Sequence, residues 1–319
     1  MPNAPAIRTE ALSKTFGKGK TSIAAVKNLN LEVERGQVYG FLGPNGAGKT
    51  TTIRMLMDLI RPSAGRAEIY GRSVREAGAL QRVGGLVEGP AFYGYLSGRN
   101  NLEVLARTAN DYRPERIRDL LEQVGLSGRA GQPVSSYSLG MKQRLGVAAA
   151  LLGDPELVVL DEPTNGLDPA GIQEMRGFIR GLAKDRGKTV FISSHLLNEV
   201  EQTCDRVAII HKGEMIREGP VAGLLAENAS TLRVQASPVE LAEQALREHW
   251  ETSREPTLGN APPWLVVAAA ASESPAVVEH LVGRSVRVHQ VVIQRQTLED
   301  YFLDAVRNPA SGNGEVDHA

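Results

Sequence analysis

The stretch GPNGAGKT at residues 43–50 decides the fold of this chain. Its glycines, Gly43, Gly46 and Gly48, let the backbone curl so that amide groups point at a phosphate, and a helix beginning there adds the positive end of its dipole. Strand-like sequence precedes the stretch. KTTTIRMLMDLI follows it, with apolar residues at helical spacing as far as Pro62. A strand, a glycine-rich loop and a helix in this order predict a phosphate-binding P-loop.

The polar side chains of this loop have separate expected roles. Lys49 should reach the β- and γ-phosphates of a nucleotide, and Thr50 should hold Mg²⁺. The other members of the loop that we assign to nucleotide binding are Pro44, Asn45, Ala47 and Thr51. The alternative is a glycine-rich turn that fits the pattern by chance, but motif and structural context agree here.

Two continuous apolar runs, ELVVLDEP and KTVFISSH, end in polar residues. This pattern is typical of parallel strands that are buried on both faces and carry function at their carboxyl ends. Asp161 is expected to hold Mg²⁺ through water, and Glu162 is a candidate base for an attacking water. His195 could hydrogen-bond the γ-phosphate, although a lone histidine at a strand end is more often structural.

The remaining segments define the organisation of the chain. Residues 7–43 alternate apolar and polar residues, which predicts half-buried strands of a sheet that leads into the P-loop. Charged helical stretches between about 88 and 153 predict a helical insertion, and RVAIIHKGEMIREG predicts a hairpin that closes a nucleotide-binding domain of residues 1–220. Residues 221–307 predict a small domain of strands and helices, and the polar tail 308–319 is expected to be disordered.

These segments predict an α/β fold. It consists of a P-loop NTPase core with an N-terminal antiparallel β subdomain and a helical insertion, plus a small C-terminal α+β domain.

The composition of the chain bears on its partners and on its cellular compartment. With 36 Lys+Arg and 37 Asp+Glu among 319 residues, the formal charge is −1, so we expect no nucleic-acid partner. The single cysteine, Cys204, excludes an internal disulfide and fits a reducing compartment. The longest apolar runs are far shorter than a membrane-spanning helix, and the N-terminus lacks a signal-peptide core. Any contact with a membrane should therefore go through a partner.

The order of motifs resembles the ATP-binding-cassette (ABC) superfamily, and within it the ATPase subunits of exporters that carry antibiotics or bacteriocin-like peptides out of bacteria. The resemblance runs from about residue 7 to residue 219. Its motifs are Phe16, the P-loop, VEGPAFYGYLSGRNNL, SYSLGMKQRL, VVLDEPTNGLD and SSH. SYSLGMKQR, residues 136–144, matches the family's signature segment. It departs from the common pattern at Leu139 and Met141, which stand in place of glycine and glutamine.

The resemblance implies further site residues. Phe16 would stack on adenine, and Glu88, at a position usually held by glutamine, would ligate Mg²⁺. Two cassettes would pair head to tail as a homodimer on ATP binding, so that Ser138 and Gly140 of one contact the γ-phosphate held by the other. Asp168, at the end of VVLDEPTNGLD, would join the nucleotide site. The alternative for Ser138 is that it caps its own helix.

The resemblance also implies a role for the whole chain. It would be a cytoplasmic ATPase subunit, peripheral on the inner face of the cell membrane, that docks beneath a separate permease and powers export of a cargo selected by that permease. The alternatives are an importer ATPase, whose motifs are the same, and a soluble non-transport ABC ATPase. The aromatic residues Phe92, Tyr93 and Tyr95 fill a core or line the permease interface.

Overall fold

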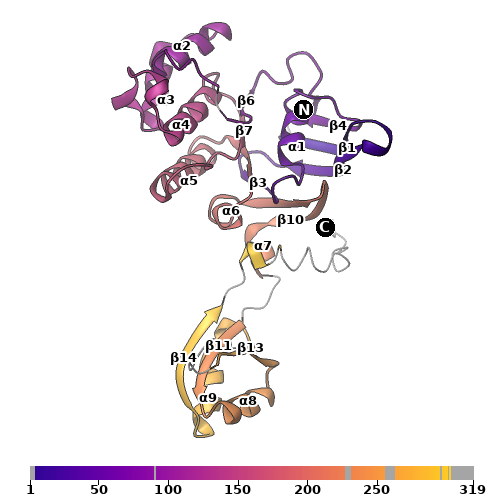
Figure 1. Ribbon diagram of the computed structural model, residues 1–319, viewed down its shortest axis with the longest axis vertical. Helices are drawn as coiled ribbons and strands as arrows, with labels where there is room; N and C mark the ends of the chain where they lie inside the picture. Colours follow the sequence, from indigo (N-terminus) through magenta and orange to yellow (C-terminus); the bar gives the residue numbers. More distant parts are fainter. Residues whose placement is uncertain are drawn as a thin grey trace. The chain divides into compact units, whose positions relative to one another are not determined.

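The computed structural model describes residues 4–89, 91–226, 231–255, 263–294, 297–300 and 302 (Figure 1). The chain forms two compact units that part between Val221 and Ala222. The first unit has two sheets and the second has one, and each unit has its own buried core. The two units are therefore described separately.

The first unit begins with an antiparallel sheet in the order β2-β1-β4-β5. Its strands are β1 (Ile7–Phe16), β2 (Ile23–Val33), β4 (Ala64–Ile69) and β5 (Arg72–Ser73). Toward the end of β2, Leu29, Leu31 and Val33 are buried and the residues between them are exposed. This alternation is the half-buried pattern that the sequence predicts.

A second sheet of the first unit carries the functional strands, in the order β10-β9-β3-β8-β7-β6. The strands are β3 (Val38–Leu42), β6 (Val83–Leu86), β7 (Leu157–Asp161), β8 (Thr189–Ser194), β9 (Arg206–His211) and β10 (Glu214–Pro220). Adjacent strands from β9 to β6 are parallel, and β10 forms the predicted hairpin with β9. The parallel, fully buried arrangement of β7 and β8 is confirmed.

One expectation about the first 43 residues is wrong. We predicted a single half-buried sheet leading into the P-loop, but β3 leaves the antiparallel sheet and pairs with β8 and β9. Every residue of β3 is buried, because layers of the first unit cover both faces of the parallel sheet. The rings of Tyr39 and Phe41 both pack against Phe191 of β8, at centroid distances of 5.8 and 5.5 Å.

Along the chain, strands β3, β7, β8 and β10 are followed by α1 (Lys49–Leu56), α5 (Pro169–Lys184), α6 (Leu197–Thr203) and α7 (Val221–Ala226), respectively. Helix α1 is shorter than the apolar spacing to Pro62 predicts. It ends at Leu56, and Asp58 has a φ of 52°. A left-handed backbone at this position cannot continue a right-handed helix.

Three α-helices of the described residues lie between β6 and β7, where the sequence predicts a helical insertion. They are α2 (Gly98–Thr108), α3 (Pro114–Gln123) and α4 (Leu139–Ala150). Figure 1 shows them grouped on the side of the parallel sheet away from the antiparallel sheet. The side chains of Ser97 and Ser138 cap α2 and α4 by accepting backbone N–H groups of the first turn.

In the described residues, the second unit contains a four-stranded antiparallel sheet, with helices α8 and α9 between its strands. Its elements are β11 (Thr231–Ser237), α8 (Val239–Arg247), β12 (Thr252–Arg254), β13 (Leu265–Ala268), α9 (Ser274–Gly283) and β14 (Arg287–Gln294). The βαββαβ sequence and the order β12-β13-β11-β14 are those of a ferredoxin-like fold. Apolar residues of β11, α8 and α9, such as Val234, Leu246 and Leu281, form its core. The tail 308–319 lies outside the described residues.

Candidate functional site

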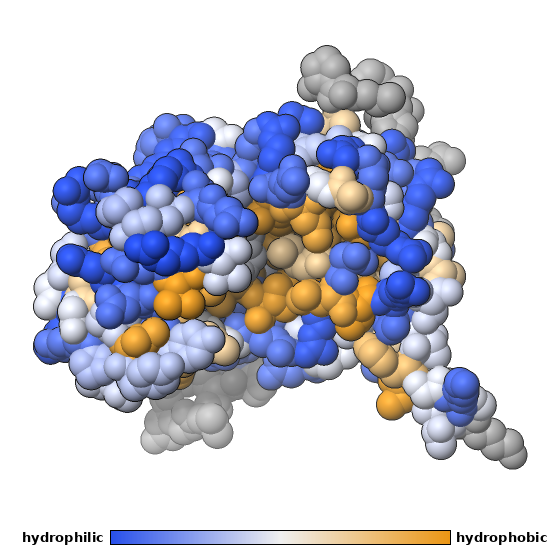
Figure 2. Space-filling view, turned by 90° about the horizontal axis from the view of Figure 1, so that it is seen from above, coloured by the Kyte–Doolittle hydropathy of each residue, from blue (hydrophilic) through white to orange (hydrophobic). Residues whose placement is uncertain are grey.

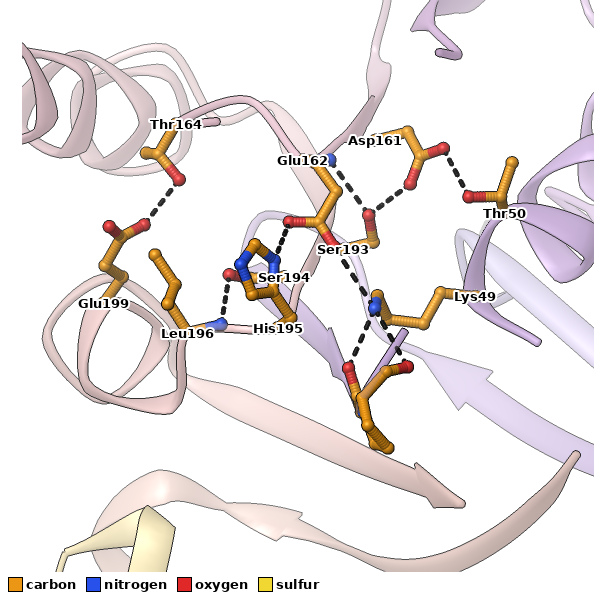
Figure 3. Close-up of polar contacts among 12 residues, drawn as sticks. Lys49, Thr50, Asp161, Glu162, Thr164, Ser193, Ser194, His195, Leu196 and Glu199 are labelled. Atoms are coloured by element: carbon orange, nitrogen blue, oxygen red, sulfur yellow. Dashed lines mark hydrogen bonds and ion pairs between the residues drawn. The ribbon is translucent and has the colours of Figure 1, made fainter. Parts of the chain in front are cut away.

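The P-loop lies between β3 and α1, at the carboxyl end of the parallel sheet. Gly48 has a φ of 108°, and a Cβ there would stand 2.4 Å from the carbonyl oxygen of Ala25, so only glycine fits. Lys49 is 6 % exposed. Its Nζ donates to the carbonyl oxygen of Gly43 at 2.8 Å and lies 3.4 Å from that of Pro44 (Figure 3). The loop therefore holds the ammonium group against its own backbone.

Thr50 and Asp161 bring hydroxyl and carboxylate oxygens together beside this loop. The hydroxyl of Thr50 donates to Oδ2 of Asp161 at 2.8 Å. Ser193, which pairs with Asp161 across β7 and β8, donates to the other carboxylate oxygen (Figure 3). Oxygen donors of this kind are the ligands that Mg²⁺ takes in proteins, so these side chains fit a magnesium ion.

Glu162 contacts a lysine and a histidine of the site. Its Oε1 lies 3.2 Å from Nζ of Lys49, and its Oε2 lies 2.7 Å from Nδ1 of His195. The carboxylate is about one-fifth exposed, so the contact with Lys49 is shielded from water more than a surface pair would be. Lysine, carboxylate and imidazole thus form one chain of contacts (Figure 3).

Two residues that the sequence reasoning missed hold the backbone of Glu162. Its φ is 51°, a left-handed value that costs free energy in a residue with a side chain. The hydroxyl of Ser193 accepts the Glu162 N–H at 3.0 Å, and Nε2 of Gln143 donates to the Glu162 carbonyl at 3.1 Å. Ser193 could have been found as a polar residue at the end of an apolar strand. Gln143 comes from α4, and no local pattern links it to Glu162.

Phe16 and Glu88 lie outside this hydrogen-bonded cluster. Phe16 is 42 % exposed, and the ammonium of Lys14 lies 5.1 Å from the centroid of its ring. Glu88 pairs with Arg54 of α1 and keeps 55 % of its side chain exposed. Among the described residues, Phe16 and Glu88 therefore make no hydrogen bond or ion pair with the cluster. The structure brings together five of the predicted residues: Lys49, Thr50, Asp161, Glu162 and His195.

Ser138, Gly140 and Asp168 line a separate open groove of about 500 Å³. Ser138 Oγ accepts the N–H of Met141 at 3.2 Å, so the helix-cap interpretation is confirmed. Asp168 caps α5 in the same way by accepting the N–H of Gly171 at 3.0 Å. Both helices thus begin at the rim of the groove, with the positive ends of their dipoles there.

The aromatic stretch after Glu88 is largely on the surface. Tyr93 is 53 % and Tyr95 is 78 % exposed, so the expectation that they fill a core is wrong, whereas Phe92 is half-buried. The amide of Asn101 fixes the Tyr93 backbone by accepting its N–H at 2.9 Å and donating to its carbonyl at 3.1 Å. Figure 2 shows an apolar hollow with hydrophilic borders on the face of the first unit that is seen from above.

A second cluster of potential ligands lies in the C-terminal unit. Glu248, His249 and His280 bring their ligand atoms within 4.8 Å of one another. The guanidinium of Arg284 pairs with Glu248 and also contacts His280. Nε2 of His280 lies 3.0 Å from the carbonyl of Ala245. These contacts link α8 to α9, and we assign the cluster a structural role.

The parallel sheet, the P-loop and the Lys49–Glu162–His195 chain define a P-loop NTPase. Residues 26–165 match the family model described as ABC transporter. Over 302 residues, the chain is 41% identical to the bacitracin transport ATP-binding protein BcrA of Bacillus licheniformis, covering 94% of this chain and 97% of the relative. The chain therefore belongs to the ABC transporter family, as one of its ATP-binding, ATP-hydrolysing subunits.

Other relatives and solved structures agree with this assignment. The lantibiotic transport ATP-binding protein SrtF of Streptococcus pyogenes is 40% identical over 212 residues, which are 66% of this chain and 90% of the relative. An ATP-binding subunit of an ABC transporter has a TM-score of 0.61 at 27% identity, over 70% and 92% of the two chains. A dimeric cassette bound to ADP and Pi, in a post-hydrolysis state, shares the fold with a TM-score of 0.62 at 24% identity, over 67% and 98%.

Among the described residues, none of the helices has the length and apolar character that crossing a membrane requires.

Proposed function

We propose that this subunit powers the export of a peptide antibiotic through a separate membrane permease, from a position on the cytoplasmic face of the membrane. The observation that carries the proposal is the 41% identity to a bacitracin transport ATP-binding protein over nearly the full length of both chains. The likeness to a lantibiotic transport protein supports the same class of cargo. Both cargoes are peptides, so the permease would recognise a peptide.

The nucleotide is Mg·ATP, bound at the P-loop. Lys49 binds the β- and γ-phosphates, and the amides of residues 43–51 surround them. Thr50 and Asp161, whose oxygens already meet at 2.8 Å, hold Mg²⁺. When bound there, the ion would neutralise phosphate charge and polarise the phosphoryl oxygens. Phe16 stacks on adenine, and the nearby Lys14 adds positive charge on this side.

Glu162 acts as the general base for the attacking water, and His195 orients it. Their contact at 2.7 Å supports this pairing, since a base must be held in place while it receives a proton. Lys49 now pairs with Glu162 at 3.2 Å. A γ-phosphate offers Lys49 a more highly charged partner, so ATP binding would release the carboxylate for water activation.

The catalytic site is completed by a second copy of the chain. Ser138 and Gly140 lie at the start of α4, where backbone N–H groups and the helix dipole favour an anion. In the first unit they line a groove apart from the Lys49 cluster, which supports action on the nucleotide of another copy. Asp168, at the start of α5 on the same groove, faces the same interface.

The permease docks on the apolar hollow shown in Figure 2. Exposed apolar area with a polar border is typical of interaction surfaces. Tyr93 and Tyr95, whose rings lie 5.9 Å apart, supply aromatic anchors near the start of the helical insertion. Glu88 lies between these tyrosines and the P-loop in sequence, so it could report permease contact to the nucleotide.

The proposal is tested by expressing the chain with its permease in a bacitracin-sensitive bacterium. We expect the minimum inhibitory concentration of bacitracin to rise, and the Lys49→Ala variant to abolish the rise. The same experiment with a lantibiotic separates the two cargoes. If the purified complex hydrolyses ATP but resistance to both peptides stays at the control level, the cargo belongs to another class.

A further inference from the structure

Leu139 is an apolar residue at an unexpected place. It is the first residue of α4, it stands between Ser138 and Gly140, and 60 % of it is exposed. A leucine at this position gains little from burial. Its side chain nevertheless has a defined neighbour, the backbone of Gly166 in the turn that follows Glu162.

The contact between Leu139 and Gly166 leaves no room for a side chain on the glycine. A Cβ on Gly166 would stand 2.3 Å from Cδ2 and 3.0 Å from Cγ of Leu139. The reciprocal contact is similar, because a Cβ on Gly140 would stand 2.9 Å from Cδ2 of Leu167. Leu139 therefore packs on Gly166, and Leu167 packs on Gly140. We call this pair of contacts between residues 139–140 and 166–167 the interlock.

The turn that receives Leu139 connects Glu162 with Asp168. Within it, the N–H of Asn165 donates to the Glu162 carbonyl at 3.1 Å, and the N–H of Leu167 donates to the Thr164 carbonyl at 3.1 Å. Helix α4 contacts this region twice, because Gln143 donates to the same Glu162 carbonyl. The start of α4 and the backbone of Glu162 are thus joined by short, direct contacts.

We infer that Leu139 is a positioning residue that couples the signature segment to Glu162 through Gly166. The inference rests on the proposed function, in which the start of α4 receives the nucleotide of a second copy. A displacement there moves Leu139, and the interlock passes the displacement to the turn and to the left-handed backbone of Glu162. The rate of ATP hydrolysis then depends on the position of the signature segment relative to the nucleotide of the second copy.

The experiment compares Gly166→Ala, Leu139→Ala and the double variant in the full chain. The added methyl group of Gly166→Ala collides with Leu139 and shifts the turn. We expect kcat for ATP hydrolysis to fall about 10-fold or more, since a mutation away from the chemistry that misplaces reacting groups by about 1 Å can cost about 10²-fold. ATP affinity of the single chain should stay within about twofold, because none of these residues belongs to the P-loop.

Removing the leucine side chain should relieve the collision. We expect Gly166→Ala/Leu139→Ala to recover at least about threefold in kcat over Gly166→Ala, which gives a coupling in the range seen for residues in contact. The matched control is Gly36→Ala. Gly36 has a φ of 73°, close to the 76° of Gly166, but nothing within 4 Å of its Cβ position. The Gly36→Ala variant measures the effect of backbone strain alone and should leave kcat unchanged.

Two results would overturn the inference. One is a double variant whose kcat equals that of Gly166→Ala, because the loss would then come from the backbone and not from Leu139. The other is a Gly166→Ala variant that melts at a lower temperature but keeps its kcat, because the contact would then be structural only. If the proposed action across a dimer is wrong, a different result is expected. Ser138→Arg would then lower ATPase activity to the same extent whether or not a second chain with an intact signature segment is present.

Discussion

The ammonium of Lys49 and the carboxylate of Glu162 lie 3.2 Å apart, although 113 positions separate them in the sequence. Lys49 is 6 % exposed and Glu162 is 20 % exposed, so water screens this pair weakly. The contact links the proposed phosphate ligand to the proposed base. It therefore predicts that changes at the two residues affect ATP binding in opposite directions.

The Lys49→Ala variant should lose ATP affinity. Truncating one partner of a buried charge pair costs about 2–5 kcal/mol, which corresponds to a loss of about 30-fold or more. Fluorescence titration with Mg·ATP measures the change. Lys27→Ala is the control, because Lys27 also pairs with a glutamate but does so at the surface. Unchanged affinity in Lys49→Ala would remove this residue from the phosphate site.

The Glu162→Gln variant should bind ATP more tightly and hydrolyse it more slowly. Loss of the carboxylate frees Lys49 and removes a negative charge near the phosphates, whereas loss of a general base costs about 10²- to 10⁴-fold in rate. Affinity and single-turnover hydrolysis are measured separately. The control is Glu214→Gln at the surface. Near-normal hydrolysis in Glu162→Gln would show that another group is the base.

The Ser138→Ala variant should lose ATPase activity beyond what the loss of a helix cap explains. Ser97 is the matched control, because it caps α2 with the same contact, 3.1 Å to the N–H of Asn100. Each substitution removes a cap that contributes about 0.5–2 kcal/mol to stability. Only Ser138→Ala should also lower kcat. Equal kcat in the two variants would leave Ser138 with its cap function alone.

Mixing two inactive variants tests whether Ser138 acts on a second copy. A heterodimer of Ser138→Arg and Lys49→Ala chains has one composite site with an intact P-loop and an intact signature segment. The other composite site carries both lesions. If Ser138 acts across the dimer, ATPase activity should recover in proportion to the fraction of heterodimer. This fraction is measured by giving the two chains different tags. Action within one chain predicts no recovery, because each chain then keeps a defective site.

The Glu218→Gln variant should be more stable than the unsubstituted chain at neutral pH. Burial raises the pKa of the Glu218 carboxyl group above its ordinary value, although it accepts a hydrogen bond from Tyr39 Oη at 2.6 Å. A raised pKa in the folded state contributes stability that is complete below the unfolded pKa and is lost as pH rises through the folded pKa. Glutamine avoids this loss and still accepts from Tyr39.

Melting temperatures between pH 4 and pH 8 check this prediction. The stabilisation by Glu218→Gln should be largest at the alkaline end and should disappear near pH 4. Glu214→Gln, on the same strand but exposed, is the control and should show no such trend. A difference between Glu218→Gln and the unsubstituted chain that does not vary with pH would contradict the role of the buried carboxylate.

The sequence by itself determined the local parts of this protein. GPNGAGKT specified the P-loop because glycine positions and a following helix are a local requirement of phosphate binding. The apolar runs ending at Asp161 and His195 specified buried parallel strands, since burial on both faces leaves no alternation. Ser138 was identified as a helix start for a similar reason, because its hydroxyl caps its own first turn.

Only the tertiary structure decided which of these parts meet. The sheet order places β3 next to β8 and β8 next to β7, so the carboxyl ends of three distant strands bring Lys49, Glu162 and His195 into contact. The same packing moved β3 out of the antiparallel sheet and set Leu139 on Gly166. Such contacts depend on strand order and side-chain volume across the fold, which periodicity within a segment does not encode.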